Sequence, residues 1–333
     1  MNNPTAIDVF LQSALGGRDY RYQAITSDAS FRRYFRVWQG QHAWVLMQSP
    51  TDKLDNAVFV ELTQHFAQHG LNVPTIIAED SSNGLLLLQD LGTEHLADRL
   101  ELDSVNADYR ALLQQIPAIA KTSHHPLMKP YDADFIAMEL DIFRHWLVEK
   151  WLGSELSPYQ QVQWQQLSES LVKLMLQQPQ VTMHRDFHSR NVIWHQQRWF
   201  LIDYQDAVTG PVTYDAVSLL RDCYTRLPAE QFAQLQQYSY QLLQDTQLLA
   251  DMSYQEYQFY FDITGIQRHL KAAGIFTRLL QRDGKAGYLD NIQPTLQYIL
   301  DVSKKHESFQ WLASWIENDI MPQVAAKLTQ TKR

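Results

Sequence analysis

The chain has 333 residues, of which 45% are hydrophobic, and its 37 Asp or Glu against 28 Lys or Arg residues give a formal net charge of −9. That apolar content can build one large domain or two smaller ones, which excludes an intrinsically disordered chain. The acidic balance argues against DNA or RNA as a partner, because such binding depends on basic side chains. It leaves room for a nucleotide whose phosphates are neutralised by Mg²⁺.

Cysteine usage and hydropathy bear on where the protein works. Cys223 is the only cysteine, so no disulfide can form within the chain, as expected in a reducing compartment. The N-terminus lacks the basic start and apolar run of a signal peptide, and no stretch reaches the roughly 18 apolar residues of a membrane span. We expect a cytoplasmic protein that contacts no membrane.

The first part of the chain is expected to hold most of the strands. Gln39 to His42 joins two of them as a hairpin, and a polar turn is expected at 81–84. The next strand contains four leucines in a row, which indicates burial on both faces. Helices are predicted at 5–15 and 54–69, and strands at 34–38, 43–47, 76–78 and 85–89.

Beyond an expected hinge at 89–93, almost every segment has the apolar spacing of a helix, including a long one over 256–281. The exception is a short hairpin, with strands at 192–194 and 199–202, that leads directly into Asp203. The chain is therefore predicted to be β-rich at first and helical afterwards.

The segment from His184 to Asn191 reads His-Arg-Asp-Phe-His-Ser-Arg-Asn, and Asp186 precedes Asn191 by five positions. Asp203 follows Asn191 by twelve positions, within Ile-Asp-Tyr. Phosphoryl transfer needs one carboxylate at the attacking hydroxyl, and an amide and a second carboxylate that hold Mg²⁺ against the phosphates. The spacing of the two segments therefore indicates a phosphate-transfer site.

A metal-dependent hydrolase is an alternative interpretation of the same segment. His184, Asp186 and His188 stand at alternate positions, and zinc and iron sites use His and carboxylate ligands. This interpretation leaves Asn191 and Asp203 without a role.

At these residues the chain resembles the aminoglycoside phosphotransferase-like kinases, which share the protein-kinase-like fold. Together with 184–191, the segments 28–36, 267–271 and 274–279 are similar to one branch of that family. This branch comprises bacterial kinases that phosphorylate the anomeric hydroxyl of N-acetylmuramate and N-acetylglucosamine during cell-wall recycling.

The resemblance implies an α+β fold of two lobes. The small lobe, 1–91, would be an antiparallel β-rich nucleotide-binding lobe, and the larger, mainly helical lobe, 92–333, would carry the catalytic loop and the acceptor pocket. By position, Asp186 would be the catalytic base, while Asn191 and Asp203 would hold Mg²⁺. The implied reaction is transfer of the γ-phosphoryl group of ATP to a sugar hydroxyl.

The nucleotide side departs from the kinase pattern. The chain contains no Gly-x-Gly-x-x-Gly loop and no Walker A sequence, and Met47 stands where the phosphate-anchoring lysine is expected. An arginine can supply that charge, because its guanidinium binds phosphate in a fork geometry, and Glu61 could pair with it. The predicted nucleotide contacts are Ser27, Ser30, Arg32, Arg33, Arg36, Gln89 and Leu91.

The acceptor side is predicted from cations and from the catalytic segment. Arg268 lies on the apolar helix over 256–281, where a cation would suit the lactyl carboxylate of N-acetylmuramate. The candidate substrate contacts are His188, Arg190, Asp222 and Arg268. Two further residues are expected to support the loop: His184 as a packed imidazole, and Asp215 as a helix N-cap that also braces the catalytic segment.

Two other functions stay open on the sequence. Related kinases phosphorylate other small hydroxyl compounds, such as aminoglycosides, choline or different sugars, and the acidic net charge is compatible with a cationic acceptor. A pseudokinase that binds nucleotide without turnover would explain the missing lysine and glycine loop. The sequence leaves open the sugar and its anomer, ATP or GTP, the arginine in use and the oligomeric state.

Overall fold

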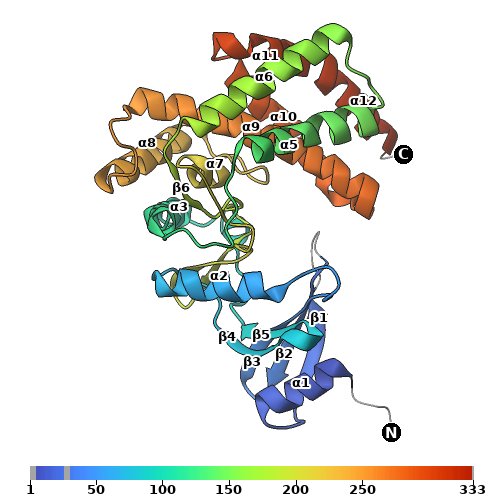
Figure 1. Cartoon of the computed structure of the whole chain (residues 1–333), viewed down its shortest axis with the longest axis vertical. Helices are drawn as coiled ribbons and strands as arrows, with labels where there is room; N and C mark the ends of the chain where they lie inside the picture. Colours follow the sequence, from blue (N-terminus) through green and yellow to red (C-terminus); the bar gives the residue numbers. More distant parts are fainter. Residues whose placement is uncertain (1–4, 26–30, 332–333) are drawn as a thin grey trace. The chain divides into compact units, whose positions relative to one another are not determined.

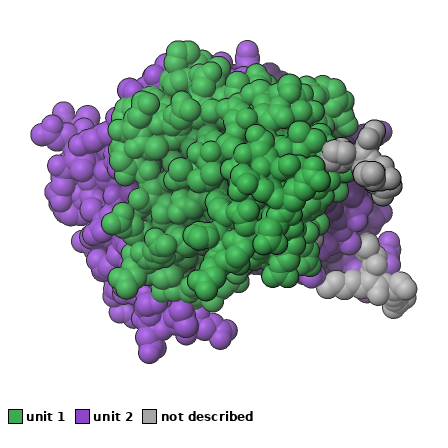
Figure 2. Space-filling view, turned by 90° about the horizontal axis from the view of Figure 1, so that it is seen from below, with its two compact units in different colours: residues 1–100, 125–127, 190–206 green, residues 101–124, 128–189, 207–333 purple. Residues whose placement is uncertain are grey.

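The structure is a computed structural model that describes residues 5–25 and 31–331. The chain forms two compact units, which are coloured separately in Figure 2. Unit 1 comprises residues 1–100, 125–127 and 190–206, and unit 2 comprises 101–124, 128–189 and 207–333. None of the helices in the described ranges is long and apolar enough to cross a membrane.

Unit 1 is built on a five-stranded antiparallel sheet in the order β1-β2-β3-β5-β4. The four predicted strands are confirmed, and β1 was missed because four of its five side chains are exposed and show no apolar alternation. The strands are β1 (Arg21–Ile25), β2 (Arg33–Gln39), β3 (His42–Gln48), β4 (Ile76–Asp80) and β5 (Leu85–Gln89).

Two predicted helices of unit 1 are confirmed as α1 (Ala6–Leu15) and α2 (Asn56–Gln68). They lie on opposite sides of the sheet (Figure 1). Strand alternation explains this arrangement, because neighbouring residues of β3 point to opposite faces. The α1 face of the sheet forms a closed apolar core of Phe10, Leu11, Phe35, Val37, Leu46, Leu85 and Leu87.

The hairpin β7 (Val192–His195) and β8 (Arg198–Leu201) also belongs to unit 1. Its turn residues Gln196 and Gln197 both have left-handed φ angles, 46° and 61°, as a two-residue hairpin requires. Backbone bonds attach it to the unit: Trp194 N–H donates to Glu94 C=O and Leu201 N–H donates to Asn72 C=O. The hairpin is therefore part of the same unit as the five-stranded sheet.

Unit 2 is mainly helical, as predicted for the second part of the chain. Its short sheet pairs β6 (Gln180–Met183) with β9 (Val208–Pro211). The helices are α3 (Val105–Leu113), α4 (Ile116–Lys121), α5 (Ala133–Ile142), η3 (Phe143–Leu152), α6 (Pro158–Leu176), α7 (Tyr214–Leu220), α8 (Ala229–Asp245), α9 (Tyr254–Asp283), α10 (Ile292–Ser303), α11 (Gln310–Trp315), η6 (Ile316–Ile320) and α12 (Met321–Thr331), with short 3₁₀ turns between some of them.

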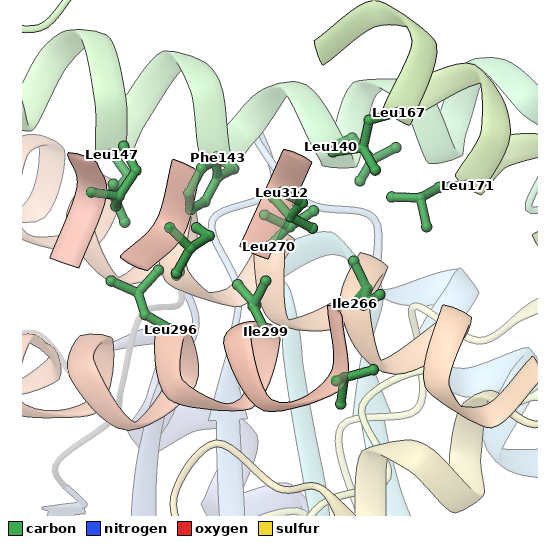
Figure 3. Close-up of a cluster of buried hydrophobic side chains, with 14 of the residues drawn as sticks. Leu140, Phe143, Leu147, Leu167, Leu171, Ile266, Leu270, Leu296, Ile299 and Leu312 are labelled. Carbon is green, nitrogen blue, oxygen red and sulfur yellow. The ribbon is translucent and has the colours of Figure 1, made fainter. Parts of the chain in front are cut away.

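The core of unit 2 is an apolar cluster that several helices share (Figure 3). Leu140 of α5, Leu171 of α6, Leu270 of α9, Ile299 of α10 and Leu312 of α11 are each at most 1% exposed and converge there. Burial of one such side chain contributes about 2 kcal/mol, so the cluster fixes the helices relative to one another.

The 30-residue helix α9 contacts α5, η3, α6, α7, α8 and α10. Its start is capped by Ser253 and Glu256 in a reciprocal capping box, and Gly284 ends it with a left-handed φ of 70°. Within α9, a Cβ added at Gly274 would lie 2.5 Å from the carbonyl oxygen of Ile142, so this glycine lets the backbones meet. Polar residues of α9 are buried as well, among them Gln267, Arg268 and Lys271.

Candidate active site

The catalytic segment follows β6 in unit 2, and Asp215 holds its start. The backbone N–H groups of His184 and Arg185 donate to the two carboxylate oxygens of Asp215 at 2.8 and 2.9 Å. Arg185 has a left-handed φ of 75°, a strained conformation that such bonds sustain. The N-cap prediction is wrong, because Thr213 is the N-cap of α7 and Asp215 lies in its first turn.

Asp222 holds the other end of the segment. Its Oδ2 accepts from the N–H of Ser189 and its Oδ1 accepts from the N–H of Tyr224, each at 2.9 Å. The side chain is 1% exposed. Both carboxylate oxygens thus bind backbone donors, which is the geometry of a loop support.

The two histidines of the segment differ in their surroundings. His184 is 1% exposed and packs its ring against Phe187, with the centroids 5.8 Å apart. His188 lies edge-on to the ring of Tyr224 at 5.4 Å. The described residues contain no group of three His, Cys, Asp or Glu side chains that could hold a metal ion, so the ligands of the hydrolase alternative are not assembled.

Asp186 is the accessible carboxylate of the segment, with 35% of its side chain exposed. Its Oδ1 lies 4.0 Å from the ammonium of Lys271. Burial alone would raise the pKa of the Asp186 carboxyl, but neighbouring cations outweigh it and hold this pKa well below its usual range. These cations are Lys271, Arg185 and Arg268, and His188 acts in the same direction when it is protonated. Asp186 is therefore an ionised acceptor at neutral pH, as a base at a hydroxyl must be.

A buried acid, Glu139 of α5, gathers the groups around Asp186. Its Oε1 accepts from Arg185 Nη2 at 2.6 Å and lies 3.4 Å from Lys271 Nζ. Its Oε2 accepts from Gln267 Nε2 at 3.0 Å and from the hydroxyl of Tyr131. Burial would raise the pKa of Glu139, but Lys271 and Arg185 lower it below the usual value, so the carboxylate stays charged.

Sequence reasoning missed both Glu139 and the role of Lys271. Glu139, Arg185 and Lys271 lie on separate elements, and no local pattern connects them. The signal that could have found Lys271 is its place among apolar residues of a long helix, where a charged side chain needs a partner.

The two arginines predicted to contact the substrate lie in different environments. Arg268 is only 4% exposed, and its Nη1 lies 3.6 Å from the sulfur of Cys223. Burial lowers the pKa of Arg268, but Cys223, Tyr214 and nearby carboxylates raise this pKa by more, so the guanidinium stays charged. Arg190 belongs to unit 1, is exposed and lies near His95.

Asn191 and Asp203 lie side by side in unit 1, at the two ends of the β7–β8 hairpin. Ile202 N–H donates to Asn191 C=O at 3.1 Å, and Asn191 Nδ2 lies 3.4 Å from Asp203 Oδ2. Asp203 has a left-handed φ of 63°, and its Oδ1 accepts from Gln205 Nε2 at 2.8 Å. Turning the Asn191 amide would present its oxygen beside the carboxylate, a pair of hard donors that suits Mg²⁺.

The predicted arginines of the nucleotide side are separated by the sheet. Arg36 binds Asp90 at 2.7 Å through Nε and donates to Gly92 C=O at 3.1 Å. Arg33 is exposed and lies over the ring of Phe35, on the α1 face. Glu61 lies 3.7 Å from His125 Nε2 rather than beside an arginine.

Arg32 lies on the opposite face, which also carries Tyr34. It is 8% exposed, and its guanidinium is 5.9 Å from the ring of Phe59 of α2. Burial raises the pKa of Tyr34 to about 12, while the charge of Arg32 lowers it and that of Asp203 raises it. Arg32 and Asp203 therefore both lie near enough to Tyr34 to act on its hydroxyl, and the fully buried Met47 pairs with Tyr34 in the sheet.

The other nucleotide predictions fall at the end of β5 or outside the described part. Gln89 Oε1 accepts from the N–H and hydroxyl of Thr75, both at 3.3 Å, and Leu91 is 4% exposed. Ser27 and Ser30 lie outside the described residues. A depression of about 620 Å³ next to this strand end is lined by Trp44, Gln89, Asp90 and His195 among others.

The family model described as "Phosphotransferase enzyme family" matches residues 21–249. An N-acetylmuramate/N-acetylglucosamine kinase from Neisseria meningitidis serogroup B is 35% identical over 302 residues, covering 89% of this chain and 90% of that protein. A kinase of the same name from Pseudomonas putida is 36% identical over 283 residues, covering 84% and 82%.

Solved structures share the fold. A choline kinase from Streptococcus pneumoniae has a TM-score of 0.63 at 13% identity, covering 89% of this chain and 98% of that one. An ADP-bound aminoglycoside phosphotransferase has a TM-score of 0.59 at 12% identity, covering 90% and 99%. The α+β kinase-like fold predicted from the sequence is confirmed, and the chain belongs to the phosphotransferase enzyme family.

Proposed function

We propose that the protein transfers the γ-phosphoryl group of ATP to the anomeric hydroxyl of N-acetylmuramate and N-acetylglucosamine. The observation that carries this proposal is the identity of 34–36% to three kinases of that name, over 82–89% of this chain. Asp186, Asn191 and Asp203 are all present, which opposes a pseudokinase.

The chemistry would rest on positioning and charge. Asp186 would accept the hydrogen bond of the sugar hydroxyl and take its proton as the new O–P bond forms and the bond to ADP breaks. Asn191 and Asp203 would hold Mg²⁺, which supplies neutralisation of phosphate charge when bound. Arg32 would supply positive charge in place of the missing lysine.

The electrostatic surroundings of Asp186 favour an anionic or neutral acceptor. Lys271, Arg185 and Arg268 all act on this carboxylate, and Glu139 offsets part of their charge. A cationic acceptor such as choline or an aminoglycoside would approach these cations unfavourably. N-acetylmuramate carries a carboxylate and N-acetylglucosamine no charge, so both are compatible with the site.

The test is an acceptor panel with purified protein, ATP and Mg²⁺. ADP release is measured with N-acetylmuramate, N-acetylglucosamine, glucose, choline and kanamycin, and the product is examined by ³¹P NMR. We expect turnover with the two N-acetyl sugars and a phosphate at C1, which removes the reducing end. Faster turnover of choline or kanamycin would contradict the acceptor assignment, and nucleotide binding without turnover of any acceptor would indicate a pseudokinase.

A further inference from the structure

We propose that Lys271 is a positioning residue of phosphoryl transfer, which holds the Asp186 carboxylate ionised and oriented from helix α9. The proposal rests on the proposed role of Asp186 as the base but not on the identity of the acceptor. It assigns a function to a side chain that lies far from the catalytic segment in the sequence.

The placement of Lys271 is the first argument. Its side chain is 6% exposed, and its Nζ donates to the hydroxyl of Tyr214 at 3.1 Å. The same atom lies 3.4 Å from Glu139 Oε1 and 4.0 Å from Asp186 Oδ1. One ammonium therefore stands between a buried carboxylate and the accessible carboxylate of the catalytic segment.

The rigidity of α9 is the second argument. Leu270, the preceding residue, is fully buried in the core that Figure 3 shows, and Gly274 brings α9 against the backbone of Ile142. The backbone from which Lys271 projects is therefore held in place by packing, with its ammonium 4.0 Å from the Asp186 carboxylate.

The balance of charges is the third argument. The negative charges of Glu139 and Asp186 lie beside the positive charges of Lys271 and Arg185, which gives a cluster of two carboxylates and two cations. Arg185 forms an ion pair with Glu139 at 2.6 Å, and its guanidinium lies over the ring of Phe135. Lys271 is the cation whose nitrogen lies between the two acids.

Other titratable groups face this cluster from each neighbouring element. Tyr131 precedes α5, Tyr214 belongs to α7, and Arg268 lies on α9. His188 acts on Asp186 from the same segment, and Asp215 of α7 does so with the opposite sign. Removing Lys271 leaves these groups in place, so its own effect on Asp186 can be measured.

The variant Lys271→Met separates this role from a merely structural one. An opposite charge at this range lowers a carboxyl pKa by about one to three units. Without Lys271, the base takes up a proton at higher pH. We expect the acid limb of the kcat/KM profile to move up by at least about one pH unit. At pH 7.5 the carboxylate is still ionised in the variant, so the fall of about tenfold or more that we expect in kcat at this pH reflects the lost orientation of the base. The dissociation constant of ADP should change less than about twofold, since a loss confined to the chemical step leaves nucleotide binding intact.

Two further variants act as controls. Lys271→Arg keeps the charge and should restore the acid limb to its wild-type position. Lys173→Met makes the same chemical change on the exposed face of α6 and should leave the profile unchanged. If Lys271→Met lowers only the thermal stability and leaves the acid limb in place, Lys271 has a structural role and the proposal is wrong.

A direct NMR titration of the Asp186 carboxyl does not depend on turnover. It can also be carried out on a double variant if Lys271→Met does not fold. The ¹³C carboxyl resonance of Asp186, assigned by its loss in Asp186→Asn, should titrate at least about one pH unit higher in Lys271→Met than in wild type. If Lys271→Met does not fold, Glu139→Gln/Lys271→Met removes one charge of each sign and carries the same measurement. An unchanged titration overturns the proposal even if no acceptor is phosphorylated, whereas a panel without turnover bears only on the proposed function.

Discussion

Asp186 is the residue on which the proposed chemistry depends. Asp186→Asn keeps the shape but cannot take a proton, so we expect kcat to fall by about 10²- to 10⁴-fold with the fold intact. Loss of the carboxylate leaves Lys271 and Arg185 with Glu139 alone, so a modest change in melting temperature is expected. A steady-state assay and a thermal melt of the same preparation measure both. A variant with near-normal kcat would show that another group is the base.

Asp203 is expected to govern metal-dependent binding of the nucleotide. Asp203→Ala removes the carboxylate that lies beside Asn191, so the gain in ADP affinity on adding Mg²⁺ should disappear. Calorimetry with and without Mg²⁺ measures the gain. Asp206→Ala changes a neighbouring exposed acid and should keep it.

Arg32 is the arginine that we expect to take over the charge of the missing lysine. It shares the surroundings of Tyr34 with Asp203, whereas Arg36 is bound to Asp90 and Arg33 lies on the α1 face. Arg32→Met should raise the KM for ATP by about tenfold or more, the loss of one charge-assisted contact. Arg33→Met is the matched control, and an equal effect of the two substitutions would contradict the assignment.

Among the elements, α9 links the core of unit 2 to the charged cluster around Glu139. Its apolar residues enter the shared core, and Gln267, Arg268 and Lys271 of the same helix are buried beside the catalytic segment. Interiors are packed too densely to absorb a shift of such a helix without cost. A change that displaces α9 should therefore affect both stability and turnover.

Gly274→Ala tests this coupling. The added methyl group would lie 2.5 Å from the carbonyl oxygen of Ile142, so α9 must move away from the end of α5. We expect a loss of about 1–3 kcal/mol in the free energy of unfolding and a lower kcat. Urea denaturation and a steady-state assay measure the two. Gly287→Ala, where nothing lies within 4 Å of the added atom, should be nearly neutral.

For the molecule as a whole, His269 is expected to make stability depend on pH. Its ring is fully buried, stacks on Tyr298 with 4.7 Å between centroids, and donates from Nε2 to Arg221 C=O at 2.9 Å. Burial, followed by the charge of Arg268, lowers the pKa of His269 to about 3. The unfolded chain binds a proton at this residue below about pH 6.5 and the folded one does not, so stability is lost as pH falls from that value toward 3.

The measurement is the free energy of unfolding in urea between pH 7.5 and 5. We expect His269→Gln to be less stable than wild type at pH 7.5 but to lose less stability on acidification. The difference in slope should approach about 1.4 kcal/mol per pH unit below pH 6. His42→Gln, a change at an exposed histidine, should keep the wild-type slope. Parallel curves for wild type and His269→Gln would refute the prediction.

Local sequence was sufficient for the strands β2, β3 and β5, for α1, α2 and α9, and for the family, because alternation, helical spacing and the His184–Asn191 motif are short-range patterns. It missed β1, β6 and β9, whose four or five residues are too short or too exposed to show a period. It also misplaced the N-cap of α7 by two positions, since the carboxylate of Asp215 is used by a distant segment.

Tertiary packing determined several side-chain contacts that spacing along the sequence could not predict. Glu139, Arg185 and Lys271 meet because three elements converge on one core, and burial then requires their charges to pair. The same holds for Asp222, whose carboxylate binds the catalytic segment, and for Arg36, which Asp90 binds. Periodicity along a chain records which face of an element is buried. The contacts across that face join residues far apart in the sequence. They are therefore decided only when the elements pack together.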